Sequence, residues 1–188
     1  VAACIAATTV SANAADEAAW NPPPVGSKLT YANANGQEEW IKIADVNGNS
    51  LKLEWSDGIT RIDNGLTSMM RDGESVDASD MQKISEMWPL AVGKSVSYYH
   101  RGTSPRGQQY QVSDKAEVTG IEEITVPGGT FKTFVVATSM DNRPWFEGKR
   151  TCWYAPEIGF CVKNDFQSYS NGTPRPASKV EFKSIAKP

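Results

Sequence analysis

The sequence contains few groups that could carry out catalysis. Its only histidine, His100, lies in the run Tyr98-Tyr99-His100-Arg101. A histidine can act as a general base, but no motif such as G-x-S-x-G identifies a nucleophile for it to activate. A lone histidine is more often a surface or hydrogen-bonded residue than a catalytic one. We therefore expect a protein that is not an enzyme and needs no cofactor.

Basic and aromatic residues form the group that most resembles a binding site. Arginine can fork onto a carboxylate or phosphate, and exposed rings stack on sugars or lipid headgroups. The same residue types at a strand edge also discourage aggregation, and we favour that simpler interpretation. The residues that we assign to a candidate ligand or partner surface are Tyr98, Tyr99, Arg101, Arg106, Trp145 and Trp153.

The cysteines favour a disulfide over a metal site. Cys152 and Cys161 lack C-x-x-C spacing and a neighbouring histidine, so zinc is not expected. The acidic stretch 72–80 also misses the calcium-loop pattern. Outside the cytoplasm an even pair of cysteines is expected to bond, provided that the register sets the two opposite each other. A four-residue loop would instead pair Tyr154 with Cys161, and the sequence leaves the turn type open.

The first residues are typical of an export signal. Residues 1–10 are small and mostly apolar, and Ala12 and Ala14 occupy the −3 and −1 positions of an A-x-A cleavage site. The run Val1-Ala2-Ala3-Cys4 also resembles a lipobox, in which Cys4 would carry a lipid anchor. Both alternatives predict an exported protein of the periplasm or the outer-membrane periphery. No later run approaches the roughly 18 apolar residues of a transmembrane span.

Composition indicates one globular domain. The chain has 188 residues, of which 39% are hydrophobic and 22% charged, and a net charge of −3. This charge gives no support for a nucleic-acid partner. We divide the chain into a signal-peptide remnant (1–14), an extended proline-rich lead-in (15–25) and a single β domain (26–188).

Alternating apolar and polar residues predict a run of short strands. We expect residues 64–78 to be a loop, followed by one short helix that begins at Ser79 and ends before Pro89. The expected strands span residues 40–46, 51–55, 59–63, 93–100, 108–119, 121–126, 130–139, 144–154, 159–167 and 180–185.

Two motifs in the C-terminal half carry a family resemblance. Residues 125–134 read TVPGGTFKTF, and residues 151–159 read TCWYAPEIG, followed by Val162-Lys163. The chain thereby resembles an uncharacterised family of exported proteins of Gram-negative bacteria with "VPAGTF" and "WYAPEVG…VK" hairpins. The resemblance implies a mainly β fold, a single curved antiparallel sheet or half-barrel, for which we expect about nine to eleven strands and one short helix.

Both motifs have the composition of folding devices rather than binding sites. Proline presets the backbone for a turn, and glycine accepts the left-handed conformation where a strand begins. Of Trp153 and Tyr154, one is expected in the core and the other on the surface. The residues assigned to this structural role are Pro127, Gly128, Gly129, Phe131, Tyr154, Pro156 and Gly159.

These observations favour a non-catalytic envelope protein that serves as an interaction platform for an envelope protein partner. The alternative is a binder of a small amphipathic ligand, an acyl chain or a glycan, held in the concavity of the sheet. A filled core with an exposed apolar patch would favour the platform, and an apolar pocket that opens to arginines would favour the ligand binder. A hydrolase would need reactive groups within hydrogen-bond reach of His100.

Overall fold

The structure is a computed structural model that describes residues 16–71 and 74–188. The predicted cleavage after Ala14 and the predicted lipidation of Cys4 lie outside the described residues. The described helices are α1 (Ala78–Ile84) and the 3-10 helix η1 (Ser85–Met87). The described strands are β1 (Glu17–Ala18), β2 (Lys28–Asn33), β3 (Glu38–Asn47), β4 (Ser50–Trp55), β5 (Thr60–Asp63), β6 (Ser68–Arg71), β7 (Ser75–Val76), β8 (Leu90–Ala91), β9 (Ser95–Thr103), β10 (Gln109–Val126), β11 (Gly129–Asn142), β12 (Phe146–Ala155), β13 (Phe160–Ser170), β14 (Thr173–Pro174) and β15 (Ser178–Ala186).

One antiparallel sheet dominates the described part of the chain. Its strands follow the order β6-β5-β4-β3-β2-β15-β13-β12-β11-β10-β9-β7, and β14 pairs with β13 beside this path. Strands β1 and β8 form a separate pair. The sheet does not close into a barrel, since β6 and β7 stand at its two ends. The prediction of a mainly β fold with one curved sheet and a short helix is confirmed.

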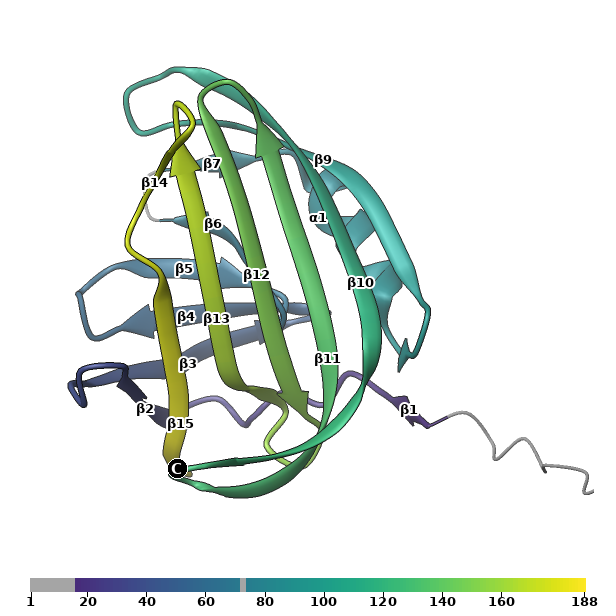
Figure 1. Ribbon diagram of the computed structural model, residues 1–188, viewed down its shortest axis with the longest axis vertical. Helices are drawn as coiled ribbons and strands as arrows, with labels where there is room; N and C mark the ends of the chain where they lie inside the picture. The colour runs from purple at the N-terminus through teal and green to yellow at the C-terminus, as the bar shows by residue number, and fades with distance from the viewer. Residues whose placement is uncertain (1–15, 72–73) are drawn as a thin grey trace, which may run out of the picture.

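The sheet bends so strongly that its two halves face each other. In Figure 1 the long strands β10 to β13 run along the molecule, and β3, β4 and β5 cross behind them. Side chains from both halves meet between them, among them Leu53 of β4, Val136 of β11 and Tyr154 of β12, all fully buried. A continuous hydrophobic core therefore fills the concave side of the sheet.

The N-terminal meander contains one strand more than we expected. Strands β3, β4 and β5 lie where the alternation predicts them, but β2 was missed. Its signal is short, because only Leu29 and Tyr31 mark the buried face.

Two expected boundaries in the centre of the chain were wrong. Residues 64–78 are not only a loop, because they contain β6 and β7. The N-cap of α1 is Asp77 rather than Ser79, since its side chain accepts a hydrogen bond from the backbone N–H of Ser79 at 2.9 Å. A further difference concerns β10. The two strands expected at 108–119 and 121–126 are one strand, with an irregularity between Val118 and Gly120. A bulge of this kind keeps pairing intact while it bends the strand.

The turns of the long strands define two ends of the sheet. At the lower end of Figure 1 lie the β10–β11 turn (127–128) and the β12–β13 turn (156–159). At the upper end lie the β9–β10 turn (104–108), the β11–β12 turn (143–145) and the β13–β14 turn (171–172).

The lead-in to the domain packs against the lower end. The ring of Trp20 lies 5.0 Å from that of Trp88, and its Nε1 donates a hydrogen bond to the carbonyl oxygen of Gly48 at 2.9 Å. Gly159, with φ of 76°, lies so close to this segment that a Cβ there would sit 2.0 Å from the carbonyl oxygen of Asn21. The turn after Pro156 therefore needs a glycine for two reasons, its backbone conformation and the neighbouring chain.

The predicted disulfide between Cys152 and Cys161 is present, and both residues are fully buried. The strand register is nevertheless the alternative one, in which Tyr154 stands opposite Cys161. We had expected a disulfide only if Cys152 stood opposite Cys161. An irregularity between Trp153 and Tyr154 makes Cys152 and Cys161 diagonal neighbours on one face, with Cα atoms 5.6 Å apart. Diagonal neighbours across a bulge can therefore bond without standing directly opposite.

The "VPAGTF"-like hairpin also has a structural place. Gly128 lies against β15, and a Cβ there would be 2.5 Å from a ring carbon of Phe182. Phe131 is buried and its ring contacts that of Phe182 edge-on, with centroids 5.8 Å apart. Pro127 and Gly129 complete the turn, Gly129 with φ of 138°.

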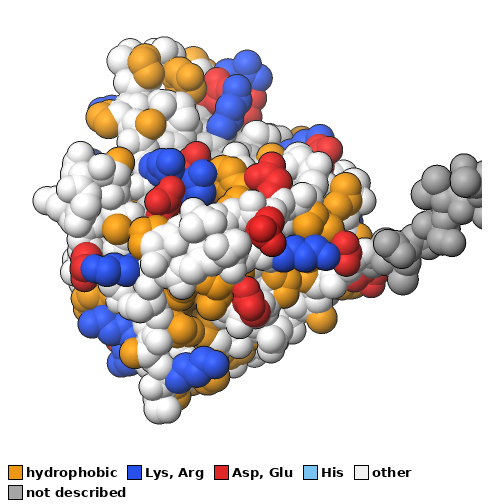
Figure 2. Space-filling model, turned by 60° about the horizontal axis from the view of Figure 1, so that its bottom comes forward, with side chains coloured by type: hydrophobic (Ala, Val, Ile, Leu, Met, Phe, Trp, Pro, Cys, Tyr) orange, Lys and Arg blue, Asp and Glu red, His pale blue; other side chains and the backbone are white. Residues whose placement is uncertain are grey.

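Figure 2, in which the lower end comes forward, shows hydrophobic side chains separated by charges of both signs. No patch of a single charge dominates this face. Among the described helices, none has the length and apolar character needed to cross a membrane.

Candidate functional site

Strand alternation separates the two tyrosines that we assigned to one surface. Tyr98 faces the core and is 8% exposed, whereas Tyr99 faces outward and is 54% exposed. Tyr98 therefore cannot contact a partner, which corrects its assignment to the candidate surface.

Trp153 lies on the outer face of β12, opposite in direction to the buried Tyr154. Its Nε1 donates a hydrogen bond to Glu122 at 2.9 Å, and the ammonium of Lys163 lies 4.3 Å from its ring centroid. A cation over the ring face covers the surface that a ligand would use. Trp153 is thus engaged within the protein.

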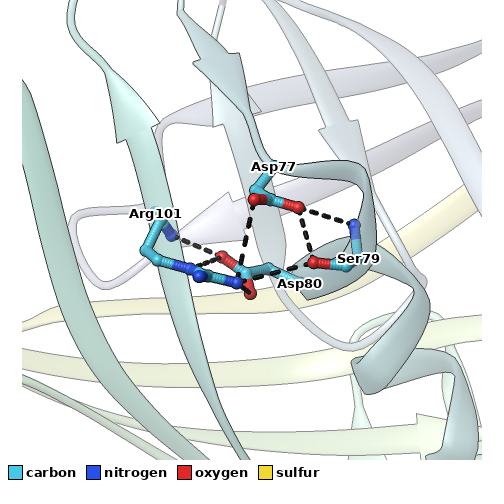
Figure 3. A network of polar contacts seen from close by, with 4 residues as sticks. All are labelled: Asp77, Ser79, Asp80 and Arg101. Carbon is cyan, nitrogen blue, oxygen red and sulfur yellow. Dashed lines mark hydrogen bonds and ion pairs between the residues drawn. The ribbon is translucent and has the colours of Figure 1, made fainter.

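Arg101 is held by two acidic residues that begin helix α1 (Figure 3). Its Nε and Nη2 donate to the two carboxylate oxygens of Asp80 at 3.0 and 2.6 Å, and Nη2 lies 3.7 Å from Asp77. The hydrogen bonds from Arg101 hold the pKa of the Asp80 carboxyl below its usual value. This bidentate pair fixes the guanidinium in one direction.

Asp80 also completes the hydrogen bonding of strand β9. The pairing of β7 with β9 ends at Val76 and Gly102, and the N–H of Asp77 then donates to the carbonyl of Arg101 at 2.9 Å. The N–H of Arg101 donates to Asp80 at 2.8 Å. At this edge the Asp80 side chain thus accepts a hydrogen bond that a neighbouring strand would otherwise accept. An unpaired backbone here could pair with a strand of another chain.

A shallow groove of about 630 Å³ lies beside this network, and we call it the β9 groove. It runs between β7 and the upper parts of β9 and β10, and most of its lining side chains are polar. The lining residues are Ser75, Val76, Asp77, Arg101, Gly102, Thr103, Gln109, Tyr110 and Gln111.

A second groove, of about 590 Å³, lies at the β11–β12 and β13–β14 turns. We call it the Trp145 groove, because Trp145 stands in the same turn as two of its lining residues and is 66% exposed. The lining residues are Arg143, Pro144, Phe146, Glu147, Tyr169, Asn171 and Gly172.

The turn that carries Trp145 is braced by backbone and side-chain contacts. The N–H of Trp145 donates to the carbonyl of Asn142, and the N–H of Asn171 donates to the carbonyl of Trp145, each at 3.0 Å. Nε of Arg143 donates to the carboxylate of Asp141 at 2.9 Å. The backbone is held on both sides while the indole ring faces solvent.

Arg106 stands in the exposed β9–β10 turn, which a hydrogen bond from Gly107 to Ser104 closes at 2.8 Å. The structure therefore places Arg106 and Trp145 in turns at the same end of the sheet, but Arg101 and Tyr99 on the outer face below the β9–β10 turn.

The sole histidine lies near a buried carboxylate. Nδ1 of His100 is 3.7 Å from Oδ2 of Asp114, which is 3% exposed. This distance exceeds the roughly 2.6–3.2 Å hydrogen bond expected between a general base and its partner. Burial, with the charge of Asp80 as a second cause, raises the pKa of Asp114 to about 7.

A second pair of charges lies further along the interior. Burial raises the pKa of the Asp63 carboxyl, and the guanidinium of Arg150 counteracts this. Nε of Arg150 donates to Asn164 at 2.9 Å. Arg150 therefore faces the interior and not the outer face that carries Arg101. Across the described residues, no three His, Cys, Asp or Glu side chains are placed to hold a metal ion.

Sequence reasoning did not find Asp80, Gln109, Gln111, Tyr169 or Asn171 as lining or positioning residues. Gln109 and Gln111 alternate with Tyr110, and this period-2 spacing could have placed them on one face with Arg101. The link between Asp80 and Arg101 joins residues 21 positions apart and has no local signal.

Comparisons with known proteins find a matching family model and similar solved structures. The model of a family described as DUF3108-like matches residues 68–172. A search of curated proteins finds no match. The solved structure of the hypothetical lipoprotein YmcC from Escherichia coli K12 has 11% identity and a TM-score of 0.54, covering 85% of this chain and 84% of that chain. A candidate lipoprotein from Parabacteroides distasonis has 13% identity and a TM-score of 0.46, covering 91% and 100% of the two chains.

Proposed function

Since the chain belongs to the DUF3108-like family and shares its fold with the hypothetical lipoprotein YmcC, we propose that it is a non-catalytic protein of the cell envelope that serves as an interaction platform. The partner that we propose is another envelope protein, and the contact surface is the Trp145 groove with the exposed indole beside it.

The observation that carries this proposal is the exposure of Trp145 on a braced turn. A rigid aromatic side chain gives a large contact area at a small cost in conformational entropy, and tryptophan is enriched at the centres of protein interfaces. The backbone hydrogen bonds of Trp145 with Asn142 and Asn171 hold the turn from which the ring projects. Among the large hydrophobic side chains of the described residues, Trp145 is the most exposed, at 66%.

The charges of the turn favour a protein partner over an anionic lipid surface. Arg143 is paired with Asp141, and Lys149 with Glu147, so the turn presents balanced charges. Anchoring to an anionic membrane depends on an excess of Lys and Arg, which these pairs do not supply.

The filled core argues against the alternative of a ligand in the concavity. Side chains of both halves occupy the concave side of the sheet, and an acyl chain would have to displace them. The platform uses the outer surface and needs no such rearrangement.

Site-specific photo-crosslinking in the native cells tests the platform. A photoreactive amino acid at position 145 should give one discrete crosslinked protein. The same amino acid at Val92, a hydrophobic residue that is 56% exposed and lies before the start of β9, is the matched control. Equal crosslinking at the two positions, or none at position 145, would contradict the proposal.

The variant Trp145→Ala gives the second arm. It should abolish co-purification of the crosslinked partner, while its melting temperature stays close to that of the parent because an exposed side chain contributes less than about 0.5 kcal/mol. A large drop in melting temperature would instead show that the Trp145 ring stabilises the fold.

We also propose that the protein is exported, either by cleavage after Ala14 or with a lipid anchor on Cys4, and the similarity to the hypothetical lipoprotein YmcC supports export. The intact mass of the protein purified from its native envelope distinguishes the two N-termini, because cleavage after Ala14 and acylation of Cys4 give different masses.

A further inference from the structure

The β9 groove combines features that the platform does not use. Three residues of β9 and three of β10 stand as cross-strand neighbours on one outer face, and the pairs are Tyr99 with Ser113, Arg101 with Gln111, and Thr103 with Gln109. Side chains directly opposite each other lie within contact distance, so these six form one continuous surface.

Most of the hydrogen-bonding groups of this surface are uncharged. The exposed amides of Gln109 and Gln111 each offer donors and an acceptor, and the hydroxyls of Ser75 and Thr103 do both as well. A ligand that matches them must itself alternate donors and acceptors. Hydroxyl groups in a row have this property.

The charged groups of the groove disfavour an anionic ligand. Arg101 is the only cation among the lining residues, and its guanidinium already serves Asp80 in a bidentate pair and Asp77 at 3.7 Å (Figure 3). Two carboxylates around one guanidinium leave a negative balance. A phosphate or uronate would therefore meet repulsion here.

The exposed ring of Tyr99 does not line the groove but lies next to one of its lining residues. Tyr99 is 54% exposed and is the diagonal neighbour of Gln111 on the same face. The flat face of a sugar ring presents C–H groups that pack on an aromatic plane, while its hydroxyls point sideways to polar partners. Diagonal neighbours of a strand pair lie roughly 7–8 Å apart, so one ligand can contact both Tyr99 and Gln111.

Gly102 allows close packing beside the groove. A Cβ at this position would lie 2.4 Å from the carbonyl oxygen of Ser75 and 2.7 Å from the hydroxyl of Tyr110. The absence of a side chain lets β7 and the ring of Tyr110 close in on β9.

A peptide would have less to bind to. The common way for a peptide to join a sheet is by pairing with a free edge, and the edge of β9 is here occupied by β7, Asp77 and Asp80. The volume of about 630 Å³ lies within the range of small-ligand sites.

We propose that the β9 groove binds a neutral glycan, with Tyr99 stacked on a sugar ring and Gln109, Gln111 and Thr103 hydrogen-bonded to its hydroxyls. This site lies on the outer face of the sheet, separate from the Trp145 groove.

The experiment is a glycan array with the full purified chain, on which neutral and acidic oligosaccharides are equally represented, followed by titration of the best neutral glycan. Neutral glycans should bind, and acidic ones should not. Tyr99→Ala and Gln111→Ala should each weaken binding about tenfold, which corresponds to 1.4 kcal/mol. Tyr99→Phe should keep the affinity, because it keeps the ring.

Ser95→Ala is the matched control, since Ser95 is exposed on the same face of β9 but lies further from the groove than Tyr99, and it should bind as the parent does. Circular dichroism of each variant verifies folding. The proposal is overturned if no neutral glycan binds, if acidic glycans bind better, or if Tyr99→Ala binds as the parent does. Crosslinking at position 145 is independent of all these outcomes.

Discussion

The two ends of the sheet differ in what their turns do. At the lower end, turns are packed against other segments, as Gly128 against Phe182 and Gly159 against Asn21. At the upper end, Gly107 and Gly172 have open space where a Cβ would stand, and the large ring of Trp145 faces solvent. Both grooves lie toward this upper end. The turns of the lower end are therefore packed against other segments, whereas the turns of the upper end are exposed.

The largest effect should come from removing the disulfide near the lower end. Changing Cys152 and Cys161 together to Ala should lower the free energy of unfolding by about 3 kcal/mol, because the unfolded chain gains freedom. Urea denaturation measures it. A reductant should destabilise the parent to a similar degree and leave the variant unchanged. If the reductant did not lower the stability of the parent, the disulfide would not be a source of stability at the lower end.

Two glycine variants compare the ends directly. Gly159→Ala and Gly172→Ala should each lose about 1 kcal/mol from positive φ, since the two angles are 76° and 74°. Gly159→Ala should lose roughly 2 kcal/mol more, because its Cβ would clash with the lead-in segment and the two cannot both keep their places. Thermal melting of both variants measures the difference. Equal losses of stability in the two variants would show that the lead-in segment moves away from the new Cβ at no cost in free energy.

The buried carboxylate of Asp114 should make stability depend on pH. Its pKa is raised to about 7, so the folded state keeps a proton that the unfolded state releases near pH 4. The contribution of Asp114 to stability is therefore largest at low pH and falls as the pH rises toward 7. Relative to Asp114→Asn, the parent should lose roughly 2 kcal/mol between about pH 5 and pH 7.

Urea denaturation of both proteins across this range measures that difference. The contributions of groups common to both proteins cancel to first order, and the titratable neighbours of Asp114 are His100 and Asp80. A constant difference at all pH values would mean that the carboxyl is ionised throughout.

Local patterns predicted the strands and turns but not the long-range arrangement. Leu51 and Leu53 alternate with charged residues and lie fully buried in β4, as expected. The same rule separates Tyr98 from Tyr99, yet grouping residues by type had put them on one surface. Alternation gives the face of a strand only once the strand itself is assigned.

The candidate sites could not be predicted because they depend on which turns share an end of the sheet. Asn171 meets Trp145 only after β12 and β13 have paired along their length. Similarly, Asp80 reaches Arg101 only because β7 pairs with β9 and so places the following helix α1 at the edge of β9. Such contacts follow from topology, which spacing in the sequence does not reveal.

The carboxylate of Asp80 has a consequence for self-association. An open sheet that ends in a two-residue strand would normally offer its last long strand as a template for fibre growth. Here one acidic side chain occupies the N–H of Arg101 and the adjoining helix covers the strand below it. The β9 edge of the unclosed sheet is thus protected against pairing with another chain.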